Sequence, residues 1–495
     1  MMQTPAESEA RSGLDHGCLP DWKVAELPEP LPFSVGNVLR TIGPGAILLA
    51  GSIGGGEWIV GPLTTVRFGP EILWIATLGI FLQMIFNLEA VRYTLYSGEP
   101  VMTGVMRLNP GGKFWGGIYV AAGTAQLATP AMAMACAGVM LTAGRGDLPS
   151  SDGSDRAIMI ALSVLVLLAT FVLLQSGKSI ERMLEWLSWT MVVLIFTFLL
   201  VTNLMFVPAD IWFSTGLGFV KPSPLPANLD WTLIGVFAAT AGSGGLGNLA
   251  VSNWTRDKGF GMAVHSGSIG GMLSEEGQDV SSIGQVFEIT SDNLRKWAIW
   301  WKYVLIDQSV LWAIGCVAGM FLNVNLARAI VNPGEIPADS AAGAFQARYL
   351  ADQLWSGFWW LTLINGFWIM FSTQVGNTDC LTRISTDTLR TGWPELGRLR
   401  ARKLYFLILL GVMVWGAIAL FLGDSAVDLF KILGLLASPI LSVGAFQILR
   451  VNTRFLPVPL RPPLWRRVCL AGCGVFYGAF ALISMVHYFG QRAAN

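Results

Sequence analysis

Histidine is almost absent from the sequence, and cysteine is scarce. Only His16, His265 and His487 occur in 495 residues, and the six cysteines are spread along the chain, mostly within apolar runs. This spacing offers no Cys/His zinc cluster and no disulfide framework. No phosphate-binding loop and no nucleophile with its base stand out either, so we expect neither an enzyme nor a cofactor.

Charged residues are also few. They make up 13% of the chain against 53% hydrophobic residues, and the mean hydropathy is +0.56. This composition excludes a soluble protein and indicates an integral membrane protein in a lipid bilayer. Basic and acidic residues number 32 each, and the resulting zero net charge argues against nucleic acid as a partner.

One apolar stretch, residues 43–62, is interrupted by three successive glycines and an ionisable residue: Gly54, Gly55, Gly56 and Glu57. Each glycine costs about 1 kcal/mol of helix propensity relative to alanine. Irregular backbone at membrane depth is tolerated where it is buried in protein or lines a cavity, and transporters build substrate sites from such interrupted helices. We therefore expect a broken helix holding a carboxylate. The alternative is a kinked helix with a glycine-rich packing face, which leaves Glu57 unexplained.

A second interrupted segment occurs in the middle of the chain. Residues 231–240 read as a helix, residues 242–248 cannot hold one, and residues 249–254 resume it. Two glycine-interrupted segments in corresponding halves indicate an inverted-repeat transporter, with its site where the two breaks meet. The candidate substrate-binding residues of this second break are Gly242, Gly244, Gly245 and Asn248.

Eleven apolar segments follow from the hydropathy. They are residues 43–62, 71–96, 114–142, 157–175, 184–206, 231–254, 300–322, 358–376, 404–422, 427–449 and 468–489. We divide the chain into a cytosolic polar tail (1–38), partly disordered, a first repeat (39–206), a second repeat (207–453) and a last helix with the C-terminus (454–495). This layout puts 24 of the 32 basic residues in the tail and the loops on its side of the membrane. The bias predicts a cytoplasmic N-terminus and an outside C-terminus, in a bacterial plasma membrane.

The first segment resembles the first helix of the Nramp (natural resistance-associated macrophage protein) divalent-metal transporters from Gly43 to Trp58. Their Asp-Pro-Gly-Asn motif falls on residues 54–57. The Gly98-Glu-Pro run, the Ser372-Thr-Gln run and Ser438-Pro439 are similar too, and the resemblance spans about residues 38–490. It implies an all-α membrane protein with about 11 transmembrane helices and the LeuT-type five-plus-five inverted repeat, with helices one and six broken.

The departures from that family fall in the site itself. The metal-binding Asp and Asn of the family's first helix correspond to Gly54 and Glu57, and its sixth-helix Met and His fall on glycines. A tenth-helix polar residue falls on Lys431. Loss of the Met removes a soft sulfur ligand, which would favour Mg²⁺ or Mn²⁺ over softer metals. We further hypothesise that Glu57 and Lys431 approach within ion-pair or water-bridged distance across the first and tenth helices. The alternative is that Lys431 extends to the outer membrane interface and does not meet Glu57.

Other ionisable residues within the apolar segments are candidates for coupling or gating. The third segment has no Asp, Glu or His, so a proton relay would have to enter through Glu57 or Glu89. Glu89 lies one turn from Arg92, which also fits a structural ion pair. Asp307 fits either a cytosolic gate or a buried relay. Asp379 and Asp387, at or beyond the end of the eighth segment, are expected to be solvated.

Three classes of function remain open from the sequence. The first is secondary transport of a divalent cation, with Glu57 as metal ligand and backbone carbonyls of both breaks completing an oxygen-rich shell. The second is transport of a small organic solute such as an amino acid, bound by free N–H groups of the half-helices. The third is a receptor or scaffold without transport. The sequence does not predict an oligomeric state.

Overall fold

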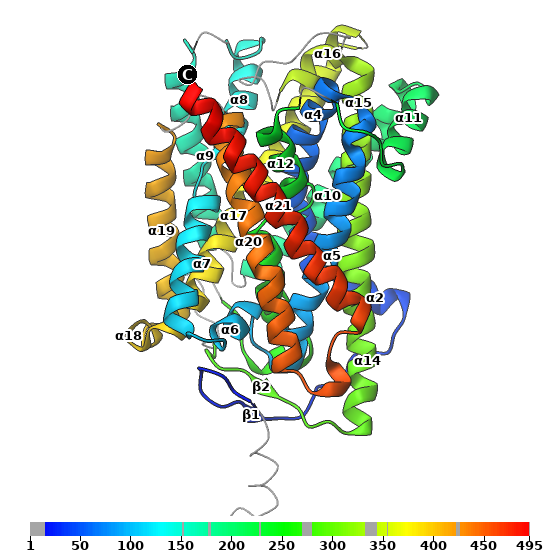
Figure 1. Cartoon of the computed structure of the whole chain (residues 1–495). Coiled ribbons are helices and arrows are strands. Elements are labelled where there is room, and N and C mark those ends of the chain that lie inside the picture. The colour runs from blue at the N-terminus through cyan, green and yellow to red at the C-terminus, as the bar shows by residue number, and fades with distance from the viewer. Residues whose placement is uncertain are drawn as a thin grey trace, which may run out of the picture.

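The protein is a bundle of long helices, and the described part of the chain contains one short two-stranded sheet (Figure 1). The structure, a computed structural model, describes residues 15–150, 153–176, 180–226, 229–269, 280–331, 344–353, 355–421 and 426–494. In the first half the main elements are α3 (Pro44–Ser52), η1 (Ile53–Val60), α4 (Gly61–Phe68), α5 (Leu73–Ser97), α7 (Gly112–Leu127), α8 (Ala131–Arg145), α9 (Arg156–Ser176) and α10 (Ile180–Phe206). In the second half they are α12 (Trp231–Thr240), α13 (Leu246–Asp257), α14 (Ser291–Leu305), η4 (Ile306–Ile314), α15 (Gly315–Ile330), α17 (Gly357–Gly392), α19 (Ala401–Ala419), α20 (Ala426–Arg454) and α21 (Leu464–Ala494).

Shorter elements lie between these long helices. They are α2 (Val35–Thr41), η2 (Pro70–Ile72), α6 (Val101–Met106), α11 (Ala209–Val220), η3 (Gly261–His265), α16 (Phe345–Gln353), α18 (Pro394–Gly397), η6 (Val458–Leu460) and the strands β1 (Lys23–Val24) and β2 (Gln285–Val286).

The helices have the length and composition of an integral membrane protein. Within the described residues, nine helical segments are long and apolar enough to cross a bilayer. The interrupted pair α12 and α13 and the long helix α17 add two crossings, which agrees with the expected eleven. The described N-terminal segment and the C-terminal end of α21 lie at opposite ends of the bundle, as an odd number of crossings requires (Figure 1).

The first interruption takes a different form from the one expected. The α-helix does stop at the glycines, but the chain continues as a π-helix, η1, through Gly54, Gly55, Gly56 and Glu57. The N–H of Gly61 bonds to the carbonyl of Gly56, five residues back, which is the wider spacing of a π-helix. The backbone here is therefore widened and not unwound, and this fold does not require an open break in the first helix.

The second interruption is an open break, as predicted. Helix α12 ends at Thr240 and α13 begins at Leu246. Between them Gly242, Gly244 and Gly245 have φ angles of +103°, +64° and +72°. Only glycine adopts such angles without strain, so these glycines allow the chain to turn between the two half-helices.

Two other segments differ from the sequence prediction. The third segment is not one helix, because α7 and α8 are separated at residues 128–130, where Pro130 cannot continue the hydrogen bonding of α7. The eighth helix continues past its expected end at Gly376 as far as Gly392. Asp379 and Asp387 therefore lie within a helix and are buried, and their predicted solvation is wrong.

From residue 15 onward the N-terminal tail packs against the bundle, whereas residues 1–14 of the tail expected to be partly disordered lie outside the described residues. Strand β1 pairs in parallel with β2, which lies in the connection between α13 and α14. Trp22 donates to Glu99 Oε1 at 2.9 Å and stacks under the guanidinium of Arg107, which also pairs with Glu99 at 2.6 Å. We call the end of the bundle where residues 15–34 lie the tail face (bottom of Figure 1).

Candidate functional site

Glu57 lies at the point where the first and sixth helices meet. Its side chain is fully buried, and its Oε1 accepts a hydrogen bond from the N–H of Gly242 at 3.1 Å. The other oxygen, Oε2, has no well-formed hydrogen bond to any residue that the structure describes. The side-chain thiol of Cys316, from α15, lies beside this carboxylate. The two interrupted helices are thus adjacent, as predicted, and share one carboxylate.

The glycines of η1 are required by close packing. A Cβ on Gly54 would lie 2.1 Å from Thr373 Oγ1, and one on Gly55 would lie 2.2 Å from the ring of Phe430. A Cβ on Gly56 would lie 1.9 Å from the carbonyl oxygen of Thr240. These glycines therefore serve helix packing, because the absence of side chains lets η1 contact α12, α17 and α20 directly. The same segment also carries the buried carboxylate of Glu57, so both interpretations of this stretch apply.

Two glutamines that the sequence analysis did not single out form hydrogen bonds with backbone groups at the open break of the sixth helix. Gln83 of α5 accepts from the N–H of Ser243 at 3.0 Å and donates to the carbonyl of Ala241 at 2.9 Å. Gln126, the penultimate residue of α7, accepts from the N–H of Leu246 at 3.1 Å and donates to the carbonyl of Gly244 at 2.9 Å. In the sequence, both glutamines could have been identified as polar amides within apolar membrane segments. Backbone groups that a solute would need are thus already bonded.

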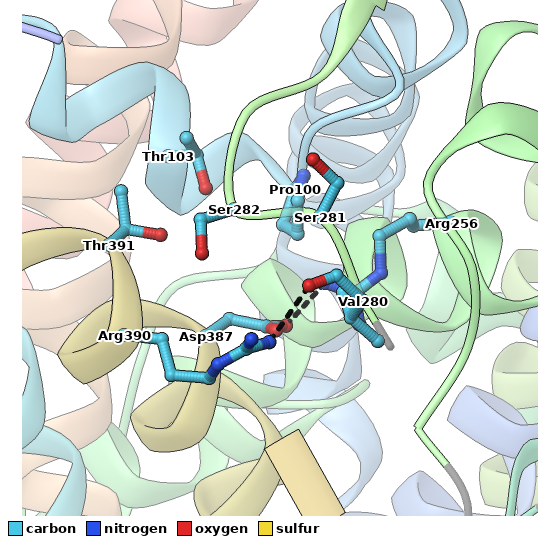
Figure 2. Close-up of a pocket in the computed structure, with 9 residues that line it drawn as sticks. All are labelled: Pro100, Thr103, Arg256, Val280, Ser281, Ser282, Asp387, Arg390 and Thr391. Atoms are coloured by element: carbon cyan, nitrogen blue, oxygen red, sulfur yellow. Dashed lines mark hydrogen bonds and ion pairs between the residues drawn. The ribbon is translucent and has the colours of Figure 1, made fainter. Parts of the chain in front are cut away.

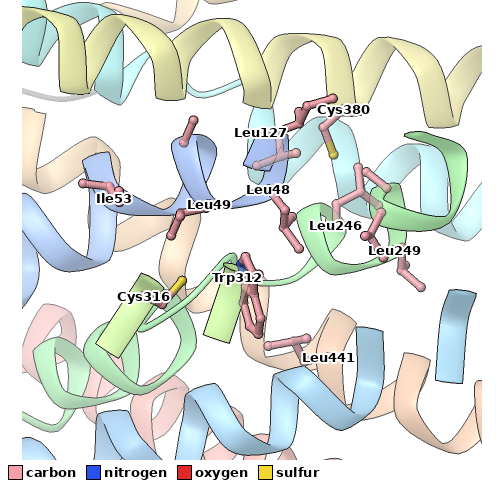
Figure 3. Close-up of a cluster of buried hydrophobic side chains, with 14 of the residues drawn as sticks. Leu48, Leu49, Ile53, Leu127, Leu246, Leu249, Trp312, Cys316, Cys380 and Leu441 are labelled. Carbon is pink, nitrogen blue, oxygen red and sulfur yellow. The ribbon is translucent and has the colours of Figure 1, made fainter. Parts of the chain in front are cut away.

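A small hydroxyl cluster lies next to Glu57 on the side of the seventh helix. The hydroxyls of Ser52 and Ser243 are 2.8 Å apart, and the indole N–H of Trp312 donates to Ser243 at 3.1 Å. Figure 3 shows Trp312 and Cys316 close to the first helix, with apolar side chains such as Leu49 around them. The hydroxyls of Ser52 and Ser243 and the indole N–H of Trp312 therefore lie among apolar side chains.

Two other predicted site residues lie on α13 and α20. Asn248 of α13 donates to Asn87 of α5 at 2.9 Å. Lys431 is half-buried on α20, directly after Phe430, which packs on Gly55. The carboxylate of Glu57 takes a hydrogen bond from Gly242, and the approach of Lys431 to Glu57 across the first and tenth helices stays a prediction.

Asp307 anchors the start of the first helix. Its two carboxylate oxygens accept from the N–H groups of Gly43 at 2.9 Å and Gly45 at 2.8 Å. A carboxylate at a helix N-terminus is stabilised by the free N–H groups and the helix dipole. Next to it Lys258 donates to the carbonyl of Ile42 and pairs with Glu185 at 2.5 Å. Asp307 therefore joins the first and seventh helices on the tail-face side.

Glu89 belongs to a structural ion-pair network near the tail face. It pairs with Arg92 at 2.7 Å and with Arg466 of α21 at 3.3 Å, and it accepts from Asn452 of α20. Both guanidinium groups lie over the ring of Trp301. These contacts favour the ion-pair interpretation of Glu89 over a role in coupling.

A further set of buried ion pairs joins α13 to α17. Arg383 pairs with Asp379 at 2.9 Å and also contacts Asp257, while Arg256 pairs with Asp387 at 2.7 Å. Figure 2 shows the last of these pairs at the edge of a polar pocket on the tail face. These charges compensate one another in pairs and join α13 to α17.

The described residues contain no group of three or more His, Cys, Asp or Glu side chains arranged to hold a metal ion. Any cation at Glu57 would therefore need ligands of other kinds, such as hydroxyl or backbone oxygens, to complete its coordination.

Comparison with known proteins gives a consistent result at the level of the fold. No family model and no curated protein matches the chain. Solved structures of the manganese transporter of Eremococcus coleocola do match. A histidine-to-alanine variant superposes with a TM-score of 0.68 at 16% identity, covering 95% of this chain and 91% of that one. A glutamate-to-alanine variant gives a TM-score of 0.67 at the same identity and coverage.

The same transporter in complex with an aromatic bis-isothiourea compound gives a TM-score of 0.65 at 15% identity, covering 95% of this chain and 92% of that one. The titles of these structures describe a manganese transporter. The chain is an integral membrane protein with the fold of these manganese transporters, and its resemblance to the Nramp transporters is confirmed for the architecture.

Proposed function

We propose that the protein is a secondary transporter of a divalent metal cation and that Glu57 is its charged ligand. The observation that carries the proposal is a fully buried carboxylate at the junction of the first and sixth helices, one oxygen of which has no well-formed hydrogen bond to the described residues. An ionised carboxylate left unpaired at membrane depth costs several kcal/mol, which a bound cation would offset. The similar structures, whose titles describe a manganese transporter, support the same class of substrate.

Transport of an organic solute is the second candidate, and the contacts of the break disfavour it. Such a solute would place its carboxylate on the N–H groups between α12 and α13. Those of Gly242, Ser243 and Leu246 already bond to Glu57, Gln83 and Gln126. An anionic solute would also meet the negative charge of Glu57.

The membrane orientation belongs to the same proposal. We place the tail face in the cytoplasm of a bacterial cell and the C-terminus outside, with residues 39–206 and 207–453 as the two inverted repeats. The bias of 24 of 32 basic residues toward the tail side supports this orientation.

The test is uptake into liposomes containing the purified full-length protein. We expect accumulation of Mn²⁺ above that of empty liposomes, and its loss in Glu57→Gln, which keeps the shape of the side chain without its charge. Glu395→Gln, at an exposed position on α18, is the matched control and should transport normally. Uptake of an amino acid in place of metal would support the solute alternative, and absence of any uptake would support a receptor or scaffold.

A further inference from the structure

The seventh transmembrane helix presents sulfur to the π-helical segment. Cys316 and Met320 lie one turn apart on α15, and both are fully buried. The Cys316 thiol lies beside the carboxylate of Glu57 and the hydroxyl of Ser52, and a Cβ on Gly319, three residues further along α15, would lie 3.9 Å from Glu57 Cγ. The Cγ and Cε atoms of Met320 are 3.3 and 3.5 Å from the position of a Cβ on Gly61, one turn after Glu57.

The backbone oxygens that we expected to surround a cation are largely engaged elsewhere. Gln83 bonds the carbonyls of Ala239 and Ala241, and Gln126 bonds that of Gly244. The carbonyl of Ala50 in the first helix accepts from the hydroxyl of Thr373. An oxygen-rich shell built from the carbonyls of both breaks would have to displace these hydrogen bonds.

The side-chain ligand atoms near Glu57 are of a different kind. The carboxylate oxygen Oε2 lacks a well-formed hydrogen bond to the described residues. The Cys316 thiol lies beside this carboxylate and also contacts the hydroxyl of Ser52, which bonds to the hydroxyl of Ser243. We propose that Cys316 binds the transported cation together with Glu57, so that the site selects a soft or borderline divalent cation over Mg²⁺. This inference rests on the proposed function and names its substrate class.

The chemistry of the pair supports this selection. A cysteine binds metal as its thiolate, so its proton is released when the cation enters. Thiolate and carboxylate together supply two negative charges, which balance a divalent cation in a buried site. Thiolate and thioether sulfur favour soft metals, whereas Mg²⁺ requires oxygen ligands in near-octahedral geometry. The sulfur lost from the sixth helix, relative to the family that this chain resembles, would thus be replaced from the seventh.

The experiment measures Cd²⁺, Mn²⁺ and Mg²⁺ binding to the purified full-length protein by calorimetry, together with the ultraviolet charge-transfer absorption of Cd²⁺–thiolate bonds. Cys316→Ser is the test variant. Cys473→Ser is the matched control, because Cys473 is equally buried but lies on α21. We expect Cd²⁺ to bind more tightly than Mg²⁺ and to produce the absorption band. Cys316→Ser should abolish the band and weaken Cd²⁺ binding at least tenfold, while Cys473→Ser changes neither.

The outcomes separate this inference from the proposed function. If the unaltered protein binds Mn²⁺ or Mg²⁺ through Glu57 but Cd²⁺ gives no thiolate band, Cys316 is not a ligand and the proposed function stands. If none of the three cations binds, the proposed function fails and this inference with it. A band that survives Cys316→Ser but is lost in Cys473→Ser would place the thiolate elsewhere and overturn the inference. Because the band is measured first on the unaltered protein, misfolding of a variant cannot hide the result.

Discussion

Gly56 provides the sharpest test of the contact between the first and sixth helices. A methyl group at this position would lie 1.9 Å from the carbonyl oxygen of Thr240, and it would have to move away by about 1.5 Å to reach an ordinary contact of 3.4 Å. The neighbour is backbone, at the end of α12, so it cannot rotate aside as a side chain would. An added methyl group in a packed interior costs about 1–3 kcal/mol of folding stability, and we expect the cost of Gly56→Ala to lie at the upper end of this range.

Gly51 on α3 offers a matched control in the same transmembrane segment. A Cβ there meets no atom within 4 Å. Gly51→Ala should therefore be neutral or stabilising by up to about 1 kcal/mol through helix propensity. We expect Gly56→Ala to lower the thermal unfolding midpoint of the purified protein well below that of Gly51→Ala, and to abolish Mn²⁺ uptake. Equal midpoints for the two variants would refute the close apposition of η1 and the sixth-helix break.

Three further changes test the surrounding contacts. Gln83→Leu leaves the N–H of Ser243 and a backbone carbonyl unpaired at about 1–3 kcal/mol each, so its unfolding midpoint in detergent should fall; an unchanged midpoint would mean that water replaces the glutamine. Asp307→Asn removes a charge from the N-terminus of α3 and should lower the midpoint by an amount corresponding to about 1.5–3 kcal/mol; a stabilised variant would contradict the anchoring role. Trp22→Ala removes the ring beneath Arg107 and should expose the tail to limited proteolysis, whereas unchanged cleavage would show that the tail is held without it.

The architecture was largely predictable from the sequence because its signals are local. Glycine clusters at 54–56 and 242–247 mark interruptions in apolar runs, and Glu57 adds a carboxylate to the first of them. Hydropathy alone located most of the membrane helices. The form of the first interruption was not predictable, because a π-helix and an open break both need glycines. The choice between them depends on the packing of η1 against Thr240, Thr373 and Phe430.

The contents of the site were harder to predict because they depend on residues distant in the chain. Gln83, Gln126 and Cys316 come from three different helices, and nothing in their local sequence indicates that they face the sixth-helix break or Glu57. Asp379 and Asp387 were assigned to solvent because the polar run around them looked like the end of a helix. Their partners, Arg383 and Arg256, neutralise them and allow the helix to continue in the interior.

The central claim is that Glu57 holds the transported cation between the first, sixth and seventh helices. The most direct measurement is an anomalous diffraction map from crystals of the full-length protein soaked in Mn²⁺. The account predicts an anomalous peak in coordination contact with Glu57, on the side of Cys316, and no such peak in crystals of Glu57→Gln. A peak bound elsewhere in the bundle, or one that persists at this position in Glu57→Gln, would contradict it.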